Sequence, residues 1–160
     1  MNADLAMLDE NFNFVWTTTN NECGGIAIDT NDLIFSMSRS GQVSVYDFQG
    51  NNVLNIDNEV AYYSVDTGHF YLHSNGDFIQ AGPAQQGGPY SIVRFDINGN
   101  QVWKKYYEED DNPLAQKASF IIREDSNGDL IIFVQNGYPW KNTNHGVVKI
   151  DINDGSKLLP

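Results

Sequence analysis

The chain has 160 residues, 41% of them hydrophobic and 12% aromatic, which is enough to bury the core of one domain and excludes a disordered chain. Nine Lys and Arg stand against 21 Asp and Glu, and the formal charge of −12 repels phosphate backbones and anionic lipid headgroups. We therefore expect no nucleic-acid partner and no membrane partner. A single cysteine, Cys23, allows no internal disulfide.

The first residues, MNADLAMLDE, lack the basic and then apolar order of a signal peptide. No apolar run approaches the roughly 18 residues that a membrane-spanning helix needs. The sequence is thus compatible with a cytoplasmic protein, or with an extracellular one whose leader has been removed.

One β-hairpin pattern recurs four times along the chain, at residues 5–17, 43–55, 91–105 and 147–159. Each copy has two apolar runs around a short turn rich in Asp, Asn and Gly, which is typical of a hairpin. A large apolar residue precedes the turn aspartate, and Asn or Gln follows two positions later. The four anchors are Asp9, Asp47, Asp96 and Asp151, and the position seven residues further on holds Trp16, Leu54, Trp103 and Leu158.

A second hairpin type alternates with the first, at residues 25–37, 70–82 and 121–134. Its anchors are Asp32, Asp77 and Asp129, each followed by two apolar residues. The flanking runs are continuously apolar, which is typical of strands covered on both faces. No stretch sustains the 3.6-residue apolar period of a helix.

These repeats predict an all-β protein built of β-propeller blades with four antiparallel strands each. A single domain, 1–160, would contain an N-terminal half-blade at 4–18 and three blades at about 24–55, 69–104 and 119–159, since a spacing of about 40–55 residues is typical of a propeller blade. An all-β sandwich is the alternative, but it does not explain why two hairpin types alternate.

The segments GGIAIDTNDLIFSM and GQVSVYDFQGNNVLN resemble the seven-bladed β-propeller repeat family. They are also similar to NHL-type and pyrroloquinoline-quinone-type propeller repeats. The resemblance implies a propeller fold and no particular function. Three blades and a half cannot close a ring, because rings take about four to eight blades. We therefore expect a homo-oligomer, or a chain completed by the remaining blades of a longer polypeptide.

Loops of variable length on one face of a propeller are where a binding site is expected. The richest such loop spans residues 135–146, where Tyr138 and Trp140 offer aromatic faces and Asn142 and His145 offer polar groups to a ligand. The alternative is that Trp140 folds back to cover a blade edge. Trp16 and Trp103 are interpreted as packing residues between blades.

No cofactor, metal site or catalytic residue is predicted. Residues 125–136 begin like a calcium-binding EF-hand loop, but Leu130 stands where glycine is needed and Asn136 where glutamate is needed. The histidines are scattered, and nothing near Cys23 in sequence would activate it.

Three functions remain open on this evidence. The first is a non-enzymatic structural or interaction module that associates with itself or forms part of a larger propeller. The second is a carbohydrate-binding or ligand-binding propeller that uses the variable loops. The third is a fragment of a propeller enzyme whose catalytic residues lie elsewhere.

Overall fold

The computed structural model describes residues 5–18, 23–38, 42–56, 69–83, 90–107, 118–136 and 144–158. Regular structure in these ranges consists of β-strands, and no helix long and apolar enough to cross a membrane occurs in them. The strands form one isolated hairpin and three larger sheets.

Each sheet is built from strands that follow one another in the chain. The N-terminal hairpin consists of β1 (Leu5–Leu8) and β2 (Phe14–Thr18). Sheet 1 contains β3 (Cys23–Ile28), β4 (Ile34–Ser38), β5 (Val43–Tyr46) and β6 (Asn52–Ile56). Sheet 2 contains β7 (His69–Leu72), β8 (Phe78–Pro83), β9 (Tyr90–Phe95) and β10 (Gln101–Tyr107), and sheet 3 contains β11 (Ala118–Glu124), β12 (Leu130–Asn136) and β13 (Asn144–Ile150). All these pairings are antiparallel, which confirms the predicted all-β architecture.

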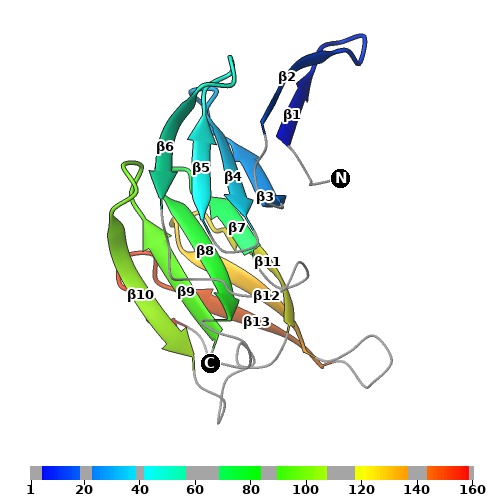
Figure 1. The fold of residues 1–160 in the computed structure, drawn as a ribbon. Coiled ribbons are helices and arrows are strands. Elements are labelled where there is room, and N and C mark those ends of the chain that lie inside the picture. Colours follow the sequence, from blue (N-terminus) through cyan, green and yellow to red (C-terminus); the bar gives the residue numbers. More distant parts are fainter. Residues whose placement is uncertain are drawn as a thin grey trace.

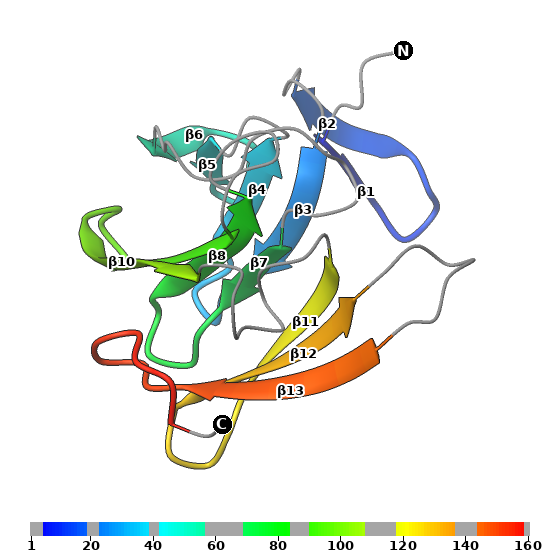
Figure 2. The ribbon, with the colours of Figure 1, turned by 90° about the horizontal axis from the view of Figure 1, so that it is seen from below.

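The sheets are layered face to face in chain order (Figures 1 and 2). Their first strands lie side by side, because β3 contacts β7 and β7 contacts β11. The N-terminal hairpin and sheet 3 lie at opposite ends of this stack (Figure 2). The first strand of each sheet is therefore the inner strand, as in the blades of a propeller.

Three apolar clusters hold the layers together, one at each seam between neighbouring layers. Between the N-terminal hairpin and sheet 1 the cluster is small: Leu5, Ile34 and Tyr46, with Trp16. Between sheets 1 and 2 it contains Phe35, Met37, Val43, Val45, Ile56, Phe78, Val93 and Phe95. Between sheets 2 and 3 it contains Ile79, Ala81, Ile92, Trp103, Tyr107, Ile122, Leu130, Ile132, Val148, Ile150 and Ile152.

Sheet 2 is covered on both faces, which explains its continuous apolar runs. On β8 the side chain of Phe78 belongs to the seam with sheet 1, and that of Ile79 belongs to the seam with sheet 3. Successive residues of a strand point to opposite faces, so both must be apolar. Phe78 stacks on Phe95 with ring centroids 5.0 Å apart.

Six of the hairpin turns share one backbone geometry, whichever hairpin type the sequence suggested. In each, the first residue donates its N–H to the carbonyl four residues on, as Asp9 does to Asn13, and accepts the N–H three residues on. The fourth residue has a positive φ, as in a three-residue hairpin loop closed by a bulge. These residues are Phe12 (63°), Asp32 (61°), Gly50 (86°), Gly76 (91°), Gly99 (85°) and Gly128 (84°).

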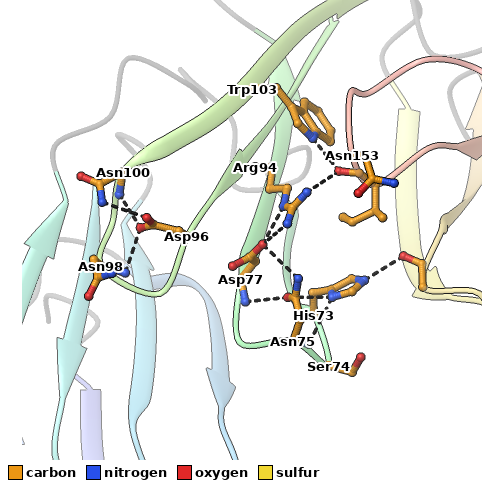
Figure 3. Close-up of polar contacts among 12 residues, drawn as sticks. His73, Ser74, Asn75, Asp77, Arg94, Asp96, Asn98, Asn100, Trp103 and Asn153 are labelled. Atoms are coloured by element: carbon orange, nitrogen blue, oxygen red, sulfur yellow. Dashed lines mark hydrogen bonds and ion pairs between the residues drawn. The ribbon is translucent and has the colours of Figure 1, made fainter.

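The carboxylate of the first turn residue closes the loop by accepting two backbone N–H groups. In the turn that Asp96 begins, Oδ1 lies 2.9 Å from the N–H nitrogen of Asn98 and 2.8 Å from that of Asn100 (Figure 3). Asp9, Asp29, Asp47 and Asp125 do the same in their turns. The side-chain amide of Asn100 and the backbone N–H groups hold the pKa of Asp96 below its usual value.

The turn geometry corrects the alignment of the second hairpin type. Asp32 occupies the positive-φ position of its turn, which is glycine in the other two turns of this type. The residue that corresponds to Asp77 and Asp129 is Leu33, because all three offer the carbonyl that closes the loop. The sequence pattern aligned Asp32 with Asp77 and Asp129 because an apolar pair follows each of them. The first residue of this turn is Asp29, and alignment on it places Leu33 with Asp77 and Asp129.

The last turn differs from the others by one residue. Asp151 donates its N–H to the carbonyl of Ser156, five positions on, and the positive φ of 75° belongs to Gly155. The returning segment forms a single bridge, Ile150 to Lys157, where a fourth strand was expected. The returning segment, described to residue 158, also donates the N–H of Leu158 to the carbonyl of Lys149.

Phe12 is the one aromatic residue in the described chain with a positive φ, and its side chain is 82% exposed. A side chain in this region costs about 1 kcal/mol, which glycine avoids. We expect Phe12→Gly to stabilise the N-terminal hairpin and Phe12→Ala, which keeps the Cβ, to leave the strain in place. Thermal unfolding of both variants checks this, and equal melting temperatures would contradict it.

Candidate functional site

The loop residues predicted to bind a ligand cannot be placed. Tyr138, Trp140 and Asn142 lie outside the described residues. His145 belongs to β13, where its backbone pairs with Gln135, but its side chain is outside the description. The binding site on the variable loops therefore stays a prediction.

Trp16 and Trp103 both lie at seams, in the outer strand of one layer. The indole Nε1 of Trp16 donates to the carbonyl of Phe48 at 3.0 Å, and that of Trp103 donates to the carbonyl of Ile152 at 2.7 Å. Each carbonyl belongs to the residue directly after the turn aspartate of the next layer. Each tryptophan is thus joined to the turn of the following layer by one hydrogen bond.

Turn glycines pack against the outer strand of the preceding layer. A Cβ at Gly50 would lie 2.8 Å from the ring of Trp16, and one at Gly155 would lie 2.7 Å from Lys105. At Gly99, where the preceding strand has no tryptophan, a Cβ would lie 2.7 Å from Ile56. All three seams therefore require a residue without a side chain at this point of the turn.

Arg94 is the centre of a polar junction between sheets 2 and 3 (Figure 3). Its Nε lies 2.6 Å from Oδ2 of Asp77 and its Nη2 lies 2.5 Å from the same oxygen. Its Nη1 donates across the seam to the carbonyl of Ile152 at 2.7 Å. The side chains of Arg94 and Asp77 are 14% and 11% exposed, so the two charges are largely withdrawn from water.

His73 links the same two sheets at the first turn of sheet 2. It stands where the other turns have aspartate, and its Nδ1 lies 2.8 Å from Oδ1 of Asn75. Its Nε2 lies 2.8 Å from the carbonyl oxygen of Gly128 in sheet 3, and because a carbonyl only accepts, Nε2 donates. Oε1 of Glu124 lies 3.5 Å from Nε2 and accepts the hydroxyl of Ser74 at 2.5 Å.

Sheet 3 carries a comparable ion pair, and among the described residues no further sheet lies beyond it. Nζ of Lys149 lies 2.7 Å from Oδ2 of Asp125 and 3.0 Å from Oδ2 of Asp129. Hydrogen bonds to Asp125 and then Asp129 raise the pKa of Lys149. In the part of the chain that the structure describes, no three His, Cys, Asp or Glu side chains are placed to hold a metal ion.

The contacts of Glu124 across the seam between sheets 2 and 3 make the free energy of unfolding depend on pH. Burial alone would raise the pKa of Glu124, but the hydrogen bonds from Ser74 and the charge of His73 outweigh it, and the pKa lies below the usual 4.5. A depressed pKa contributes stability above about pH 4.5 that is lost as the pH falls through the lowered value. We expect urea unfolding of the wild type to lose more stability between about pH 6 and pH 3 than that of Glu124→Gln. Parallel losses in the two proteins would contradict this account.

Both ends of the stack expose apolar side chains on the faces of their sheets. At the C-terminal end these are Ile121, Phe133 and Val147 of sheet 3. At the N-terminal end they are Ile26 and Ile28 of β3, together with Leu8 and Val15 of the hairpin. We call these two sets the C-terminal open face and the N-terminal open face.

Sequence reasoning did not identify the junction residues or the composition of the open faces. His73 could have been noticed, because it replaces the aspartate that begins most of the turns. Arg94 and Glu124 carry no such signal, since Asp77 lies 17 residues before Arg94 and the partners across the seam lie 50 or more residues away. The open faces depend on which layer has a neighbour, and no local pattern encodes that.

Comparison with known proteins agrees with the fold and adds no function. No protein-family model and no curated protein matches the chain. A protein of unknown function from Bacteroides caccae superimposes with a TM-score of 0.56 at 12% identity, over 98% of this chain and 68% of that one. BamB from Moraxella catarrhalis superimposes with a TM-score of 0.57 at 15% identity, over 92% of this chain and 40% of that one.

The likeness to BamB, a β-propeller, and the layered four-stranded sheets define the class: this chain has the fold of propeller blades. At these identities the likeness shows the fold alone, and the chain spans less than half of the length of BamB. The resemblance to propeller repeats is thus confirmed as a fold, and none of the particular repeat families is supported.

Proposed function

We propose that this protein is a non-enzymatic structural or interaction module that associates with further copies of itself through its exposed sheet faces. The observation that carries the proposal is the exposure of Ile121, Phe133 and Val147, at 54%, 44% and 54%. Within the stack, positions of the same kind are covered by the next layer. An apolar sheet face that repeats an internal interface is suited to a further layer.

Sedimentation equilibrium over a wide range of protein concentration tests this function. One chain has a mass of 18.0 kDa, and we expect the weight-average mass to rise above this value with concentration. A mass of one chain at every concentration would overturn the proposal. Intact secondary structure by circular dichroism is the control that any larger species is folded protein.

A second function, binding of a carbohydrate or another ligand, rests on the aromatic loop between β12 and β13. Tyr138 and Trp140 offer flat apolar faces on which a sugar ring can stack. A glycan array with the wild type and Trp140→Ala tests it, and Trp140→Phe is the control that keeps a stacking face. Binding that survives Trp140→Ala would remove this residue from the site.

A further inference from the structure

The C-terminal open face contains an apolar row that crosses the whole of sheet 3. Ile121 pairs with Phe133, and Phe133 pairs with Val147, so the three side chains stand side by side on one face. With strands about 4.8 Å apart, the row is about 10 Å wide. The neighbouring row on the same face contains Arg123 and Lys149, each paired with Ile131 of β12.

The same positions in sheet 2 show what this row is suited to contact. Counted from the turns, Phe133 and Val147 correspond to Ala81 and Ile92, which also pair with each other. Ala81 and Ile92 are fully buried, in the cluster that joins sheet 2 to sheet 3. Each sheet thus offers this face to the next layer, and in sheet 3 the face has no such layer among the described residues.

The N-terminal open face is the opposite half of the same kind of interface. A Cβ at Gly25 of β3 would lie 3.5 Å from Phe70 of sheet 2, so this position faces sheet 2. Successive residues of a strand face opposite sides, so Ile26 and Ile28 face away from sheet 2, and each is 55% exposed. In sheet 3 the residue that corresponds to Ile26 is Ile122, which is 4% exposed because sheet 2 covers it.

The N-terminal hairpin leaves the inner part of sheet 1 uncovered. Its small cluster with sheet 1 reaches Ile34 of β4 and Tyr46 of β5, but neither Ile26 nor Ile28 of β3. The outward side chains of the hairpin, Leu8 and Val15, extend the exposed apolar surface at this end.

We propose that the C-terminal open face of one copy docks on the N-terminal open face of a second copy, so that the stack of layers continues head to tail from chain to chain. This contact rests on the proposed self-association and specifies it. The occupant is a second copy because the chain carries both halves of one interface, and sheets 2 and 3 show those halves joined. Contacts of this kind close into a ring or extend into a filament.

Charge favours this arrangement over a symmetric one. The hairpin residues 5–18 contain two acids, Asp9 and Glu10, and no lysine or arginine, whereas on the C-terminal open face Arg123 lies in one row with Lys149, whose ammonium is already paired with Asp125 and Asp129. Lys149 occupies the position of Arg94, whose Nη1 reaches the turn of the next layer. Two C-terminal open faces placed together would instead leave Arg123 without the acids of the hairpin opposite it.

Two exposed charge substitutions, one on each face, test the contact. Phe133→Glu blocks the C-terminal open face, and Ile26→Glu blocks the N-terminal one. We expect each variant alone to associate roughly 100-fold more weakly than the wild type, as for a charge placed in the centre of an interface. Mixed in equal amounts, the two are expected to form a heterodimer that grows no further, because each supplies the intact face that the other lacks.

Val102→Glu is the matched control, since Val102 is 47% exposed but lies on β10 of the internal sheet 2. It should associate like the wild type, and the melting temperatures of all three variants should show that the fold is retained. Sedimentation velocity at one total concentration measures every sample.

The outcomes separate this contact from the function on which it rests. A wild type that stays monomeric would overturn both. If the wild type associates and the two face variants associate equally well, the contact is wrong and self-association stands. If Phe133→Glu is monomeric but Ile26→Glu associates like the wild type, two C-terminal open faces meet, the contact is symmetric and the head-to-tail arrangement is overturned. If both variants are monomeric and their mixture forms no complex, the head-to-tail arrangement is overturned as well.

Discussion

Replacing Arg94 by valine is expected to lower the free energy of unfolding by about 3–5 kcal/mol, the cost of leaving one charge of a buried ion pair uncompensated. The substitution leaves the carboxylate of Asp77, a residue 8% exposed, with its remaining hydrogen bond from Asn75. It also removes the donor that crosses from sheet 2 to the carbonyl of Ile152. Urea unfolding followed by circular dichroism measures the loss.

Sheet 1 provides the control for this prediction, because it holds apolar residues at both positions of the ion pair. Leu33 corresponds to Asp77 and Val45 to Arg94. The double variant Asp77→Leu with Arg94→Val therefore copies a pair that the fold already accepts, and well-packed apolar replacements of buried ion pairs are often neutral. We expect it to recover most of the loss, to within about 1.5 kcal/mol of the wild type. A double variant as unstable as Arg94→Val would show that the cost lies in packing and not in the unpaired carboxylate.

The second large effect is expected at Gly99, where the turn of sheet 2 meets the outer strand of sheet 1. Its φ of 85° disfavours any side chain, and a Cβ would lie 2.7 Å from Cγ1 of the buried Ile56. The backbone cost of about 1 kcal/mol and an overpacking cost of about 1–3 kcal/mol act together. Gly99→Ala is therefore expected to destabilise the protein by about 3 kcal/mol.

Gly128 separates the two contributions, because it has nearly the same φ, 84°, with open surroundings. The atoms closest to a Cβ there belong to the ring of His73 at 3.8 Å, an ordinary contact distance. Gly128→Ala should thus cost about 1 kcal/mol, the backbone contribution alone. If both variants lose the same free energy of unfolding, the side chains at the seam between sheets 1 and 2 rearrange to accommodate the added methyl group without an overpacking cost.

The two ends of the molecule differ from the terminal units of stable repeat proteins, which carry a polar outer face. Here the N-terminal hairpin covers only the outer half of sheet 1, and the last layer presents Ile121, Phe133 and Val147 to solvent. At both ends of the described stack, exposed apolar side chains therefore resemble those buried between the inner layers. These exposed apolar faces are the physical basis of the proposed self-association.

Sequence alone was sufficient for the hairpins, because their signals are local. An aspartate that begins a turn binds the N–H groups two and four residues further on, so all the information lies within five residues, as at Asp96 and Asn100. The same locality explains the misplaced Asp32: the turn was recognised, but its first residue was not. The predicted fourth strand of sheet 3 is represented among the described residues by the bridge from Ile150 to Lys157 and the hydrogen bond from Leu158 to Lys149.

What the sequence by itself determined is the period of the chain: alternating hairpins, a positive-φ residue in each turn and apolar runs long enough for strands covered on both faces. Only the tertiary structure decided which faces are covered. Ala81 and Phe133 occupy corresponding positions of sheets 2 and 3, yet one is fully buried and the other 44% exposed. The reason is that burial depends on the presence of a neighbouring layer, which is a property of the stack and not of the residue. The contacts of Arg94 with Ile152 and of Glu124 with Ser74 were undetermined for the same reason, since each joins two neighbouring sheets.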